Sequence, residues 1–409
     1  GPVQQAFHIG AGASATPGLV SGLASVHGDL GNLPWAALLS PAIGLARGGV
    51  PMTPFQVYLF TVVAPILTAS AEAREVFAPQ GVLLGTGDMF ATPRLAETLR
   101  DIARAGSEEV TGDGLAEAIV IQSQMSGGHL TRDDLASYTV ERRSPLDLDW
   151  AGHSVLLNPP PAAGGALVGI GLAALGDQDV TVETLLAAME TVNEIRREAD
   201  GKPDRILQHP LLSGALAKSA SHPPSSRGTT HLSVIDAEGN AAAATVSNGE
   251  GNGLMLGETG VMLNNMLGEE DVLPDGLGSW DTNVRLSSMM APTIVSGTDG
   301  SVMAFGSGGS NRIRTALMQV IARAAAGDAD LEAAVVAPRM HLEKDGALSF
   351  EDFFRAEERA VLMDRNPDAH AWDARNMFFG GVHAVKRSAD GTFTGAGDAR
   401  RGGVVALVD

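Results

Sequence analysis

The sequence has no cysteine, few aromatic residues and no long apolar run. Without cysteine the chain forms no disulfide, has no thiol nucleophile and offers no thiolate to a metal. The longest apolar stretch, 57–69, contains Pro65 and is shorter than the ~18 residues that span a membrane, so we expect a buried helix there instead. The lack of cysteine is compatible with the cytoplasm, which we slightly favour, and with the periplasm.

Basic residues are also scarce. The 28 Lys and Arg residues stand against 48 Asp and Glu residues, which gives a net charge of −20. An acidic surface repels phosphate backbones and anionic membranes, so we expect neither a nucleic acid nor a membrane as partner. The ten histidines show no metal-ligand spacing, and the glycine-rich runs lack the Lys-Ser/Thr ending of a phosphate loop. We therefore expect no metal and no cofactor, and we interpret the charged runs 343–344 and 351–359 as solvated surface.

What the chain does contain is small residues and a composition shift near its middle. Fifty glycines among 409 residues allow helices and strands to pack closely, as in a layered body. Pro93–Ala105 and 181–199 have the apolar spacing of helices. After residue 228 the pattern changes to alternating strands at 231–235 and 241–245, joined by a polar hairpin turn.

The change in composition near residue 228 is the most informative feature of the sequence. A Ser- and Pro-rich segment, 218–228, is expected to be exposed and easily cleaved, and it ends at Thr229, which opens a strand. Most junctions of this kind are only a loop that meets a strand. Composition alone therefore does not assign chemistry to Thr229.

Ordered motifs around this junction resemble those of the gamma-glutamyltransferases, within the N-terminal-nucleophile hydrolases. Thr-Thr-His-Leu-Ser-Val-Ile-Asp at 229–236 is similar to the start of their small subunit. Further motifs follow in family order at 239–241, 257–265, 285–289, 292–295, 306–309 and 397–400. The first half is similar at 16–18, 41–43, 127–128, 133–135 and 160–161.

The resemblance implies an α+β fold, the four-layer αββα sandwich of the N-terminal-nucleophile hydrolases. Residues 1–228 would form the large-subunit part and 229–409 the small-subunit part, intertwined in one domain even after cleavage. In the family an N-terminal segment precedes the counterpart of 16–18 and supplies an arginine that binds the substrate carboxylate. We expect this segment to be missing, because neither Arg47 nor Arg94 has the matching context; a shortened chain, proteolysis or a divergent subfamily could explain it.

The resemblance also implies a self-activated threonine. Cleavage between Gly228 and Thr229 would be driven by the Thr229 hydroxyl, and Gly228, without a Cβ, favours the backbone contortion this needs. The freed α-amine of Thr229, with an ordinary pKa of about 7.7–8.0, would then be the base for the same hydroxyl. Gly308 and Gly309, between a strand and a helix, would donate N–H groups to the oxyanion.

Other residues correspond to substrate-binding positions of the family. Ser287 and Ser288 match the serines that hold the glutamyl carboxylate. Ser247 matches the hydroxyl that supports the nucleophile, with Thr245 as a competing alignment. Asn248 and Glu269 match the asparagine and the acid that bind the substrate, each within about one position of register.

Three departures bear on the substrate. The acid at Glu269 is one carbon longer than the Asp usual in the family. Met266 stands where glutathione-handling members carry Gln or Glu, and a thioether cannot hydrogen-bond an α-amino group in their place. Ala163 stands where serine is common. The expected activity is a self-processing hydrolase or transferase of gamma-glutamyl amides such as glutathione, with water or an amino acid as acceptor. The alternatives are an amide hydrolase for another acyl group, like cephalosporin acylases or oxamate amidohydrolases, and an uncleaved, non-catalytic relative.

Overall fold

The computed structural model describes residues 7–199, 201–215, 229–269, 278, 280, 282–326 and 330–408. The chain divides into two compact units, each considered by itself below. The first comprises Gly1–Arg142 and Asn248–Ser279, and the second comprises Arg143–Ser247 and Trp280–Asp409. Each unit therefore combines residues from before and after Thr229.

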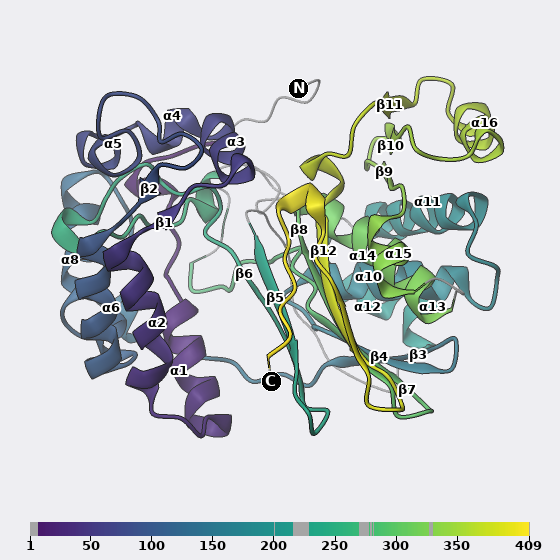
Figure 1. Cartoon of the computed structure of the whole chain (residues 1–409), viewed down its shortest axis with the longest axis horizontal. Coiled ribbons are helices and arrows are strands. Elements are labelled where there is room, and N and C mark those ends of the chain that lie inside the picture. Colours follow the sequence, from purple (N-terminus) through teal and green to yellow (C-terminus); the bar gives the residue numbers. More distant parts are fainter. Residues whose placement is uncertain are drawn as a thin grey trace. The chain divides into compact units, whose positions relative to one another are not determined.

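The first unit is mainly helical (Figure 1). Its helix α6 begins with a proline in the first turn, as the sequence predicts, and Thr131 caps α9 in a capping box with Asp134. A small apolar core forms around α7, α8 and α9. The elements of this unit are α1 (Leu19–Leu30), α2 (Trp35–Gly48), β1 (Val50–Pro51), α3 (Pro54–Val62), α4 (Ala64–Leu67), α5 (Ala71–Phe77), β2 (Met89–Phe90), α6 (Pro93–Ala105), α7 (Glu108–Thr111), α8 (Leu115–Met125) and α9 (Arg132–Ala136).

The apolar stretch 57–69 does not form the single buried helix that we expected. It is divided between α3, which has no buried residue, and α4, which buries Ile66 and Leu67. Pro65 lies in the first turn of α4, where its missing N–H costs nothing, so it starts a new helix. Among the described helices, none is long and apolar enough to cross a membrane.

The second unit is built on an antiparallel six-stranded sheet in the order β13-β12-β8-β7-β4-β3. A separate three-stranded sheet has the order β11-β10-β9. The strands are β3 (Leu146–Trp150), β4 (His153–Leu157), β5 (Thr230–Ile235), β6 (Ala241–Val246), β7 (Thr293–Gly297), β8 (Val302–Gly308), β9 (Met340–Leu342), β10 (Leu348–Glu351), β11 (His370–Trp372), β12 (Gly381–Arg387) and β13 (Phe393–Ala396).

Helices cover one face of this sheet and form the main core with it. Where α10 packs on α14, a Cβ on Gly171 would lie 2.4 Å from the Met318 sulfur, so a larger residue there would require the Met318 side chain to move. The helices of this unit are α10 (Ala163–Leu175), α11 (Val182–Glu198), α12 (Pro203–Gln208), α13 (Pro210–Ser213), α14 (Ile313–Ala325), α15 (Leu331–Val336) and α16 (Ala356–Arg365).

The hairpin β5–β6 packs on the other face of the sheet, against β8 and β12 (Figure 1). The contact is close because β8 presents glycine there. A Cβ on Gly306 would lie 2.1 Å from Nδ1 of His231. Side chains on one face of a strand recur every two residues, so Gly308 faces the hairpin in the same way. The second unit thus stacks three layers: the helices, the six-stranded sheet and the β5–β6 hairpin.

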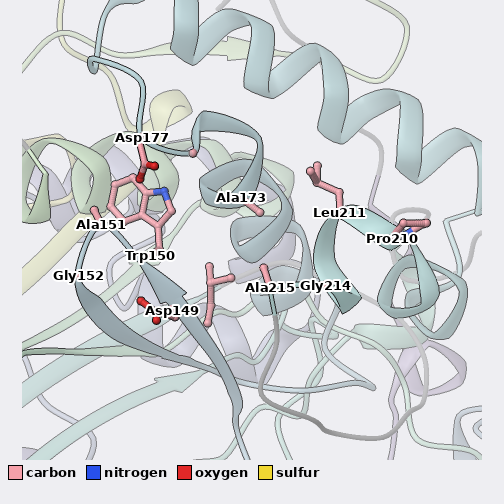
Figure 2. Close-up of a pocket in the computed structure, with 12 residues that line it drawn as sticks. Asp149, Trp150, Ala151, Gly152, Ala173, Asp177, Pro210, Leu211, Gly214 and Ala215 are labelled. Atoms are coloured by element: carbon pink, nitrogen blue, oxygen red, sulfur yellow. The ribbon is translucent and has the colours of Figure 1, made fainter.

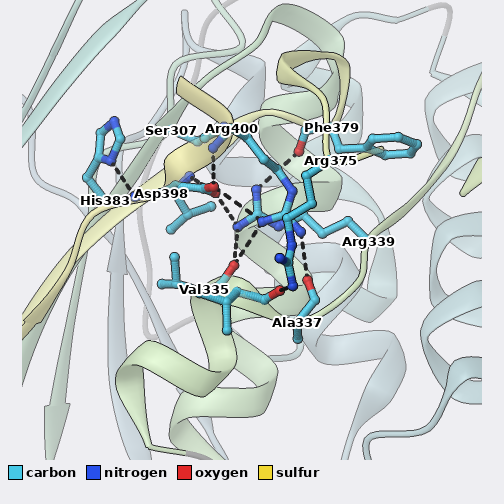
Figure 3. Close-up of polar contacts among 12 residues, drawn as sticks. Ser307, Val335, Ala337, Arg339, Arg375, Phe379, His383, Asp398 and Arg400 are labelled. Atoms are coloured by element: carbon cyan, nitrogen blue, oxygen red, sulfur yellow. Dashed lines mark hydrogen bonds and ion pairs between the residues drawn. The ribbon is translucent and has the colours of Figure 1, made fainter. Parts of the chain in front are cut away.

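A buried ion-pair network joins the end of the chain to this body. Asp398 lies between Arg339, at 2.6 Å, and Arg400, at 3.2 Å, as Figure 3 shows. Arg400 also pairs with Glu351 at 2.5 Å, and all four side chains are almost completely buried. The expectation that the charges of 351–359 are solvated surface is therefore wrong for Glu351. Burial of two carboxylates here is possible because two guanidinium groups compensate them.

Candidate active site

Thr229 lies immediately before β5, against the end of β8. A Cβ on Gly308 would lie 2.4 Å from the Thr229 carbonyl oxygen, so glycine is required for this approach. The Thr229 hydroxyl is buried and has no hydrogen-bond partner among the residues that the structure describes. Such a group is uncommon, because a buried hydroxyl without a partner costs roughly 1–3 kcal/mol. Gly228, the other side of the predicted cleavage site, lies outside the described residues, as does the segment 218–227.

The turn after Gly308 is strained and leads into a helix. Gly309 has φ 127° and Ser310, a residue with a Cβ, has φ 62°. Non-glycine residues rarely adopt positive φ, and such strain gathers at functional sites. The N–H groups of Gly309 and Ser310 make no hydrogen bond in the described part of the chain. Two unused N–H groups before the N-terminus of α14 can bind an anion or an oxyanion.

Ser247 and Thr245 are the two candidates for the hydroxyl that supports the nucleophile, and they lie in different places along β6 and its end. Thr230 pairs with Val246 at the end of the β5–β6 ladder, so Ser247 continues opposite Thr229. Thr245 pairs with His231 and its Oγ1 lies 2.8 Å from the His231 Nδ1. The geometry therefore favours Ser247 as the hydroxyl next to Thr229, and Thr245 as a partner of the histidine.

His231 fixes the strand that carries Thr229. Its Nε2 lies 2.8 Å from the Ser233 hydroxyl, so both ring nitrogens have hydroxyl partners. Burial, with a smaller contribution from the nearby His383, lowers the pKa of His231 to about 4. The imidazole is therefore neutral at pH 7, and because neutral imidazole has one N–H, it donates to one hydroxyl and accepts from the other.

This pKa predicts an acid-sensitive fold. Between pH 6.5 and 4 the unfolded chain binds a proton at His231 and the folded chain does not, so the free energy of unfolding falls as the pH falls through this window. The contribution, on the order of 3 kcal/mol, is fully present above pH 6.5. Denaturant unfolding at pH 7 and pH 4.5 measures it. His231→Gln should remove this part of the pH dependence; an unchanged dependence in the variant would contradict the assignment.

Ser287 and Ser288 lie at the same end of the sheet as Gly308, just before β7. The Ser287 hydroxyl is buried and donates to the Pro161 carbonyl at 2.8 Å. The Ser288 oxygen accepts from the Met290 N–H at 2.9 Å, so its own O–H remains available as a donor. The Ser288 carbonyl accepts from Ala163 at the start of α10. Of the two serines, Ser288 is thus the better placed to donate to a carboxylate.

Asn248 and Glu269 belong to the first unit, where they share a loop cluster. Glu269 is 1% exposed. A Cβ on Gly249 would lie 2.5 Å from Oε1 of Glu269 and 2.0 Å from Oδ1 of Asn265, so Gly249, at φ 60°, brings the loop onto both side chains. The exposed Asn248 donates weakly to the Met262 carbonyl, at 3.5 Å. Within their unit these predicted substrate residues are therefore neighbours.

Sequence reasoning missed several residues around the Gly308–Gly309 turn. Gly380 packs on the turn, since a Cβ on Gly309 would lie 2.8 Å from the Gly380 Cα. The Arg401 guanidinium borders the same turn, 3.1 Å from where a Gly308 Cβ would be. The Gly397–Arg400 motif pointed to this end of the chain without assigning it a role. Arg47 and Arg94, in the first unit, pair with the surface carboxylates of Glu97 and Glu258.

A surface pocket of about 420 Å³ lies elsewhere in the second unit (Figure 2). Trp150, Asp149 and Asp177 are among the residues that line it. It is located at the turn between β3 and β4, which is the opposite end of the sheet from Gly308. It includes none of the predicted site residues. Within the described ranges, no three His, Asp or Glu side chains gather as metal ligands.

A strand-initiating threonine above a strained glycine turn, within stacked sheets and helices, defines the class of the N-terminal-nucleophile hydrolases. The crystal structure of cephalosporin acylase from Bacillus halodurans has the same fold, with a TM-score of 0.83 over 99% of this chain and 80% of that one, at 24% identity. The sequence model of the gamma-glutamyltranspeptidase family matches residues 2–408. The chain belongs to the gamma-glutamyltranspeptidase family.

Relatives with known names include both hydrolases and acylases. The glutathione hydrolase proenzyme of Escherichia coli (strain K12) is 28% identical over 95% of this chain and 74% of its own length. The acylase ACY 1 proenzyme of Pseudomonas sp. (strain V22) is 29% identical over the same shares. The predicted family, the α+β fold of the N-terminal-nucleophile type and the enzyme class are confirmed: the chain is a gamma-glutamyltransferase-like amidohydrolase or acyltransferase.

Proposed function

We propose that the chain cuts itself between Gly228 and Thr229 and then hydrolyses or transfers gamma-glutamyl amides through an ester on Thr229. The observation that carries the proposal is the buried Thr229 hydroxyl, which has no hydrogen-bond partner among the described residues and lies at the Gly308–Gly309 turn. The N–H groups of Gly309 and Ser310 in this turn make no hydrogen bond in the described part of the chain. The relatives' names support self-processing, since both are proenzymes.

The proposed reaction needs only groups of this chain and water. The Thr229 oxygen attacks the amide carbonyl, its proton passes to the Thr229 α-amine, and the unused N–H groups of Gly309 and Ser310, at the Gly308–Gly309 turn, hold the oxyanion. Collapse breaks the C–N bond, and the leaving amine takes the proton. Water, or the amine of an acceptor amino acid, then attacks the ester and returns the proton to Thr229. Ser247 would hold the hydroxyl in place.

The same proposal divides the chain into a large part, 1–228, and a small part, 229–409. Each compact unit contains residues of both parts. In the second unit the strands of the large part, β3 and β4, are continuous with β7 of the small part in one sheet. Cleavage before Thr229 would therefore leave the two fragments associated, because separating them would break this sheet and expose its core.

The acyl donor follows from the substrate-binding residues. Ser288, with its free O–H, and Ser287 support an acyl group that ends in a carboxylate, as gamma-glutamyl does. By the family resemblance, Asn248 and Glu269 correspond to residues that bind the substrate, and Met266 stands where Gln or Glu would hydrogen-bond its α-amine, which a thioether cannot do. The replacement at Met266 favours, as the second candidate, an amide hydrolase whose acyl group lacks the α-amine.

A pair of chromogenic substrates tests the acyl group. Gamma-glutamyl-p-nitroanilide and glutaryl-p-nitroanilide differ only in the α-amine, and release of p-nitroaniline reports hydrolysis of each. We expect both to be cleaved, with kcat/KM values within about tenfold, because Met266 offers the amine no hydrogen bond. Met266→Gln should raise the preference for the gamma-glutamyl substrate by about tenfold, the value of one hydrogen bond to a charged group.

Two results would contradict this. A gamma-glutamyl preference above a hundredfold in the natural chain would mean that another group, such as the Glu269 carboxylate, binds the amine, and that the loss of Gln or Glu at Met266 does not set the preference. Cleavage of neither anilide by a chain that has cut itself would exclude carboxylate-ended acyl groups of this length and leave a different amide as substrate.

A further inference from the structure

Arg401, the residue that follows the Gly397–Arg400 motif, lies at the Gly308–Gly309 turn. It ends the short 3₁₀ turn Ala399–Arg401 and is half-buried. Its Nη1 is 3.1 Å from the Cβ position of Gly308, and its Nη2 is 3.5 Å from that of Gly309. The Thr229 carbonyl oxygen lies 2.4 Å from the same Cβ position of Gly308. The guanidinium and the nucleophilic residue are therefore close neighbours across the glycine.

The position of this side chain is fixed from two sides. Its stem lies on Gly381, where an added Cβ would be 2.6 Å from the Arg401 Cβ and 2.7 Å from its Cδ. Its Nη2 lies 3.5 Å from the Met377 carbonyl. A longer residue at 381 would push the stem away from the turn, so glycine on this face of β12 is what allows Arg401 to reach it.

The backbone below Arg401 is held by the buried ion-pair network. Arg400, the preceding residue, donates to the carbonyls of Val335 and Ala337 (Figure 3). It also donates to the Glu351 carboxylate. Asp398 accepts from the Val382 N–H of β12. Because Asp398 and Arg400 are held by these contacts, the backbone at Arg401 has little freedom. The Arg401 guanidinium therefore keeps its position beside the turn.

We propose that Arg401 is an electrostatic positioning residue of the acyl-transfer step. A guanidinium stays charged at every pH at which the enzyme works. Fixed charge at the place where negative charge develops lowers the barrier without binding the ground state more tightly, so it acts on kcat. Arg401 would act through the Gly308–Gly309 turn and favour the oxyanion that the turn's N–H groups hold. This inference rests on the proposed acyl transfer at Thr229.

Three variants and one rescue test the inference with the full chain and gamma-glutamyl-p-nitroanilide. Arg401→Gln should lower kcat by about 10- to 100-fold and change KM less than threefold, as expected for an interaction that strengthens in the transition state. Arg401→Lys, which keeps the charge, should retain more than a third of the activity. Guanidinium ion at 20 mM should restore part of the kcat of Arg401→Ala and leave the natural chain unchanged.

The outcomes separate this inference from the function on which it rests. A natural chain that is neither cut before Thr229 nor active would overturn both. A cut, active chain whose Arg401→Gln variant keeps its kcat would overturn the inference alone. Equal losses in Arg401→Gln and Arg401→Lys, with lowered thermal midpoints and no guanidinium rescue, would show that Arg401 is only a structural residue. The thermal midpoint of each variant is measured alongside.

Discussion

Replacing Thr229 by alanine is expected to lower amide hydrolysis by at least about 10⁴-fold and to leave the chain in one piece. The substitution removes both the atom that attacks the substrate and the atom that cuts the chain, and loss of a nucleophile is among the largest single effects known in enzymes. Within the described part of the chain the hydroxyl has no hydrogen-bond partner, so its removal should cost the fold little. Initial rates with gamma-glutamyl-p-nitroanilide and a denaturing gel measure both effects.

The neighbouring residue provides a matched control. Thr230 is exposed at the start of β5, so Thr230→Ala should remain cut and keep activity within about threefold. Thr229→Ser keeps a hydroxyl and should still be cut, more slowly. Full activity of Thr229→Ala, or equal losses in the two alanine variants, would remove Thr229 from its proposed role.

The second large effect is expected from the buried ion pairs. Glu351→Gln leaves Arg400 with one carboxylate in place of two, in a site that is almost fully closed to water. Breaking a buried pair by removing one partner costs about 3–5 kcal/mol, because the remaining charge is no longer compensated. The thermal midpoint should therefore fall by on the order of 10 °C. Differential scanning calorimetry of the natural chain and the variant measures it.

A surface pair serves as the comparison for this variant. Asp101 pairs with Arg104 on α6, and their side chains are 42% and 76% exposed. Asp101→Asn should shift the midpoint by no more than about 2 °C, since water already solvates both charges. If both variants shift the midpoint equally, burial is not what makes the Glu351 pair strong.

Local signals in the sequence predict a good part of the fold. The apolar spacing and the first-turn proline give α6 its observed bounds, and the alternation after residue 228 gives the β5–β6 hairpin. The stretch 57–69 was harder, because composition does not say where a proline ends one helix and begins the next. Which face of each strand meets which neighbour depends on contacts between distant segments, and no local pattern contains that.

In the candidate site, too, some residues are predictable from the sequence and others are not. Thr229, Gly308 and Gly309 could be named from their motifs, and the structure brings them together through Gly306 and Gly308 on one face of β8. Arg401 and Glu351 could not. A charged residue in a polar run looks solvated in the sequence, and only the fold reveals that Arg400 compensates Glu351 or that Gly381 leaves room for Arg401.

The most direct test of the account is the intact mass and N-terminal sequence of the purified natural chain. We expect two fragments that co-purify, the smaller of which begins Thr229-Thr230-His231. A single uncut chain, or a cut at another bond, would contradict it, because Thr229 would then have no free α-amine to act as its base.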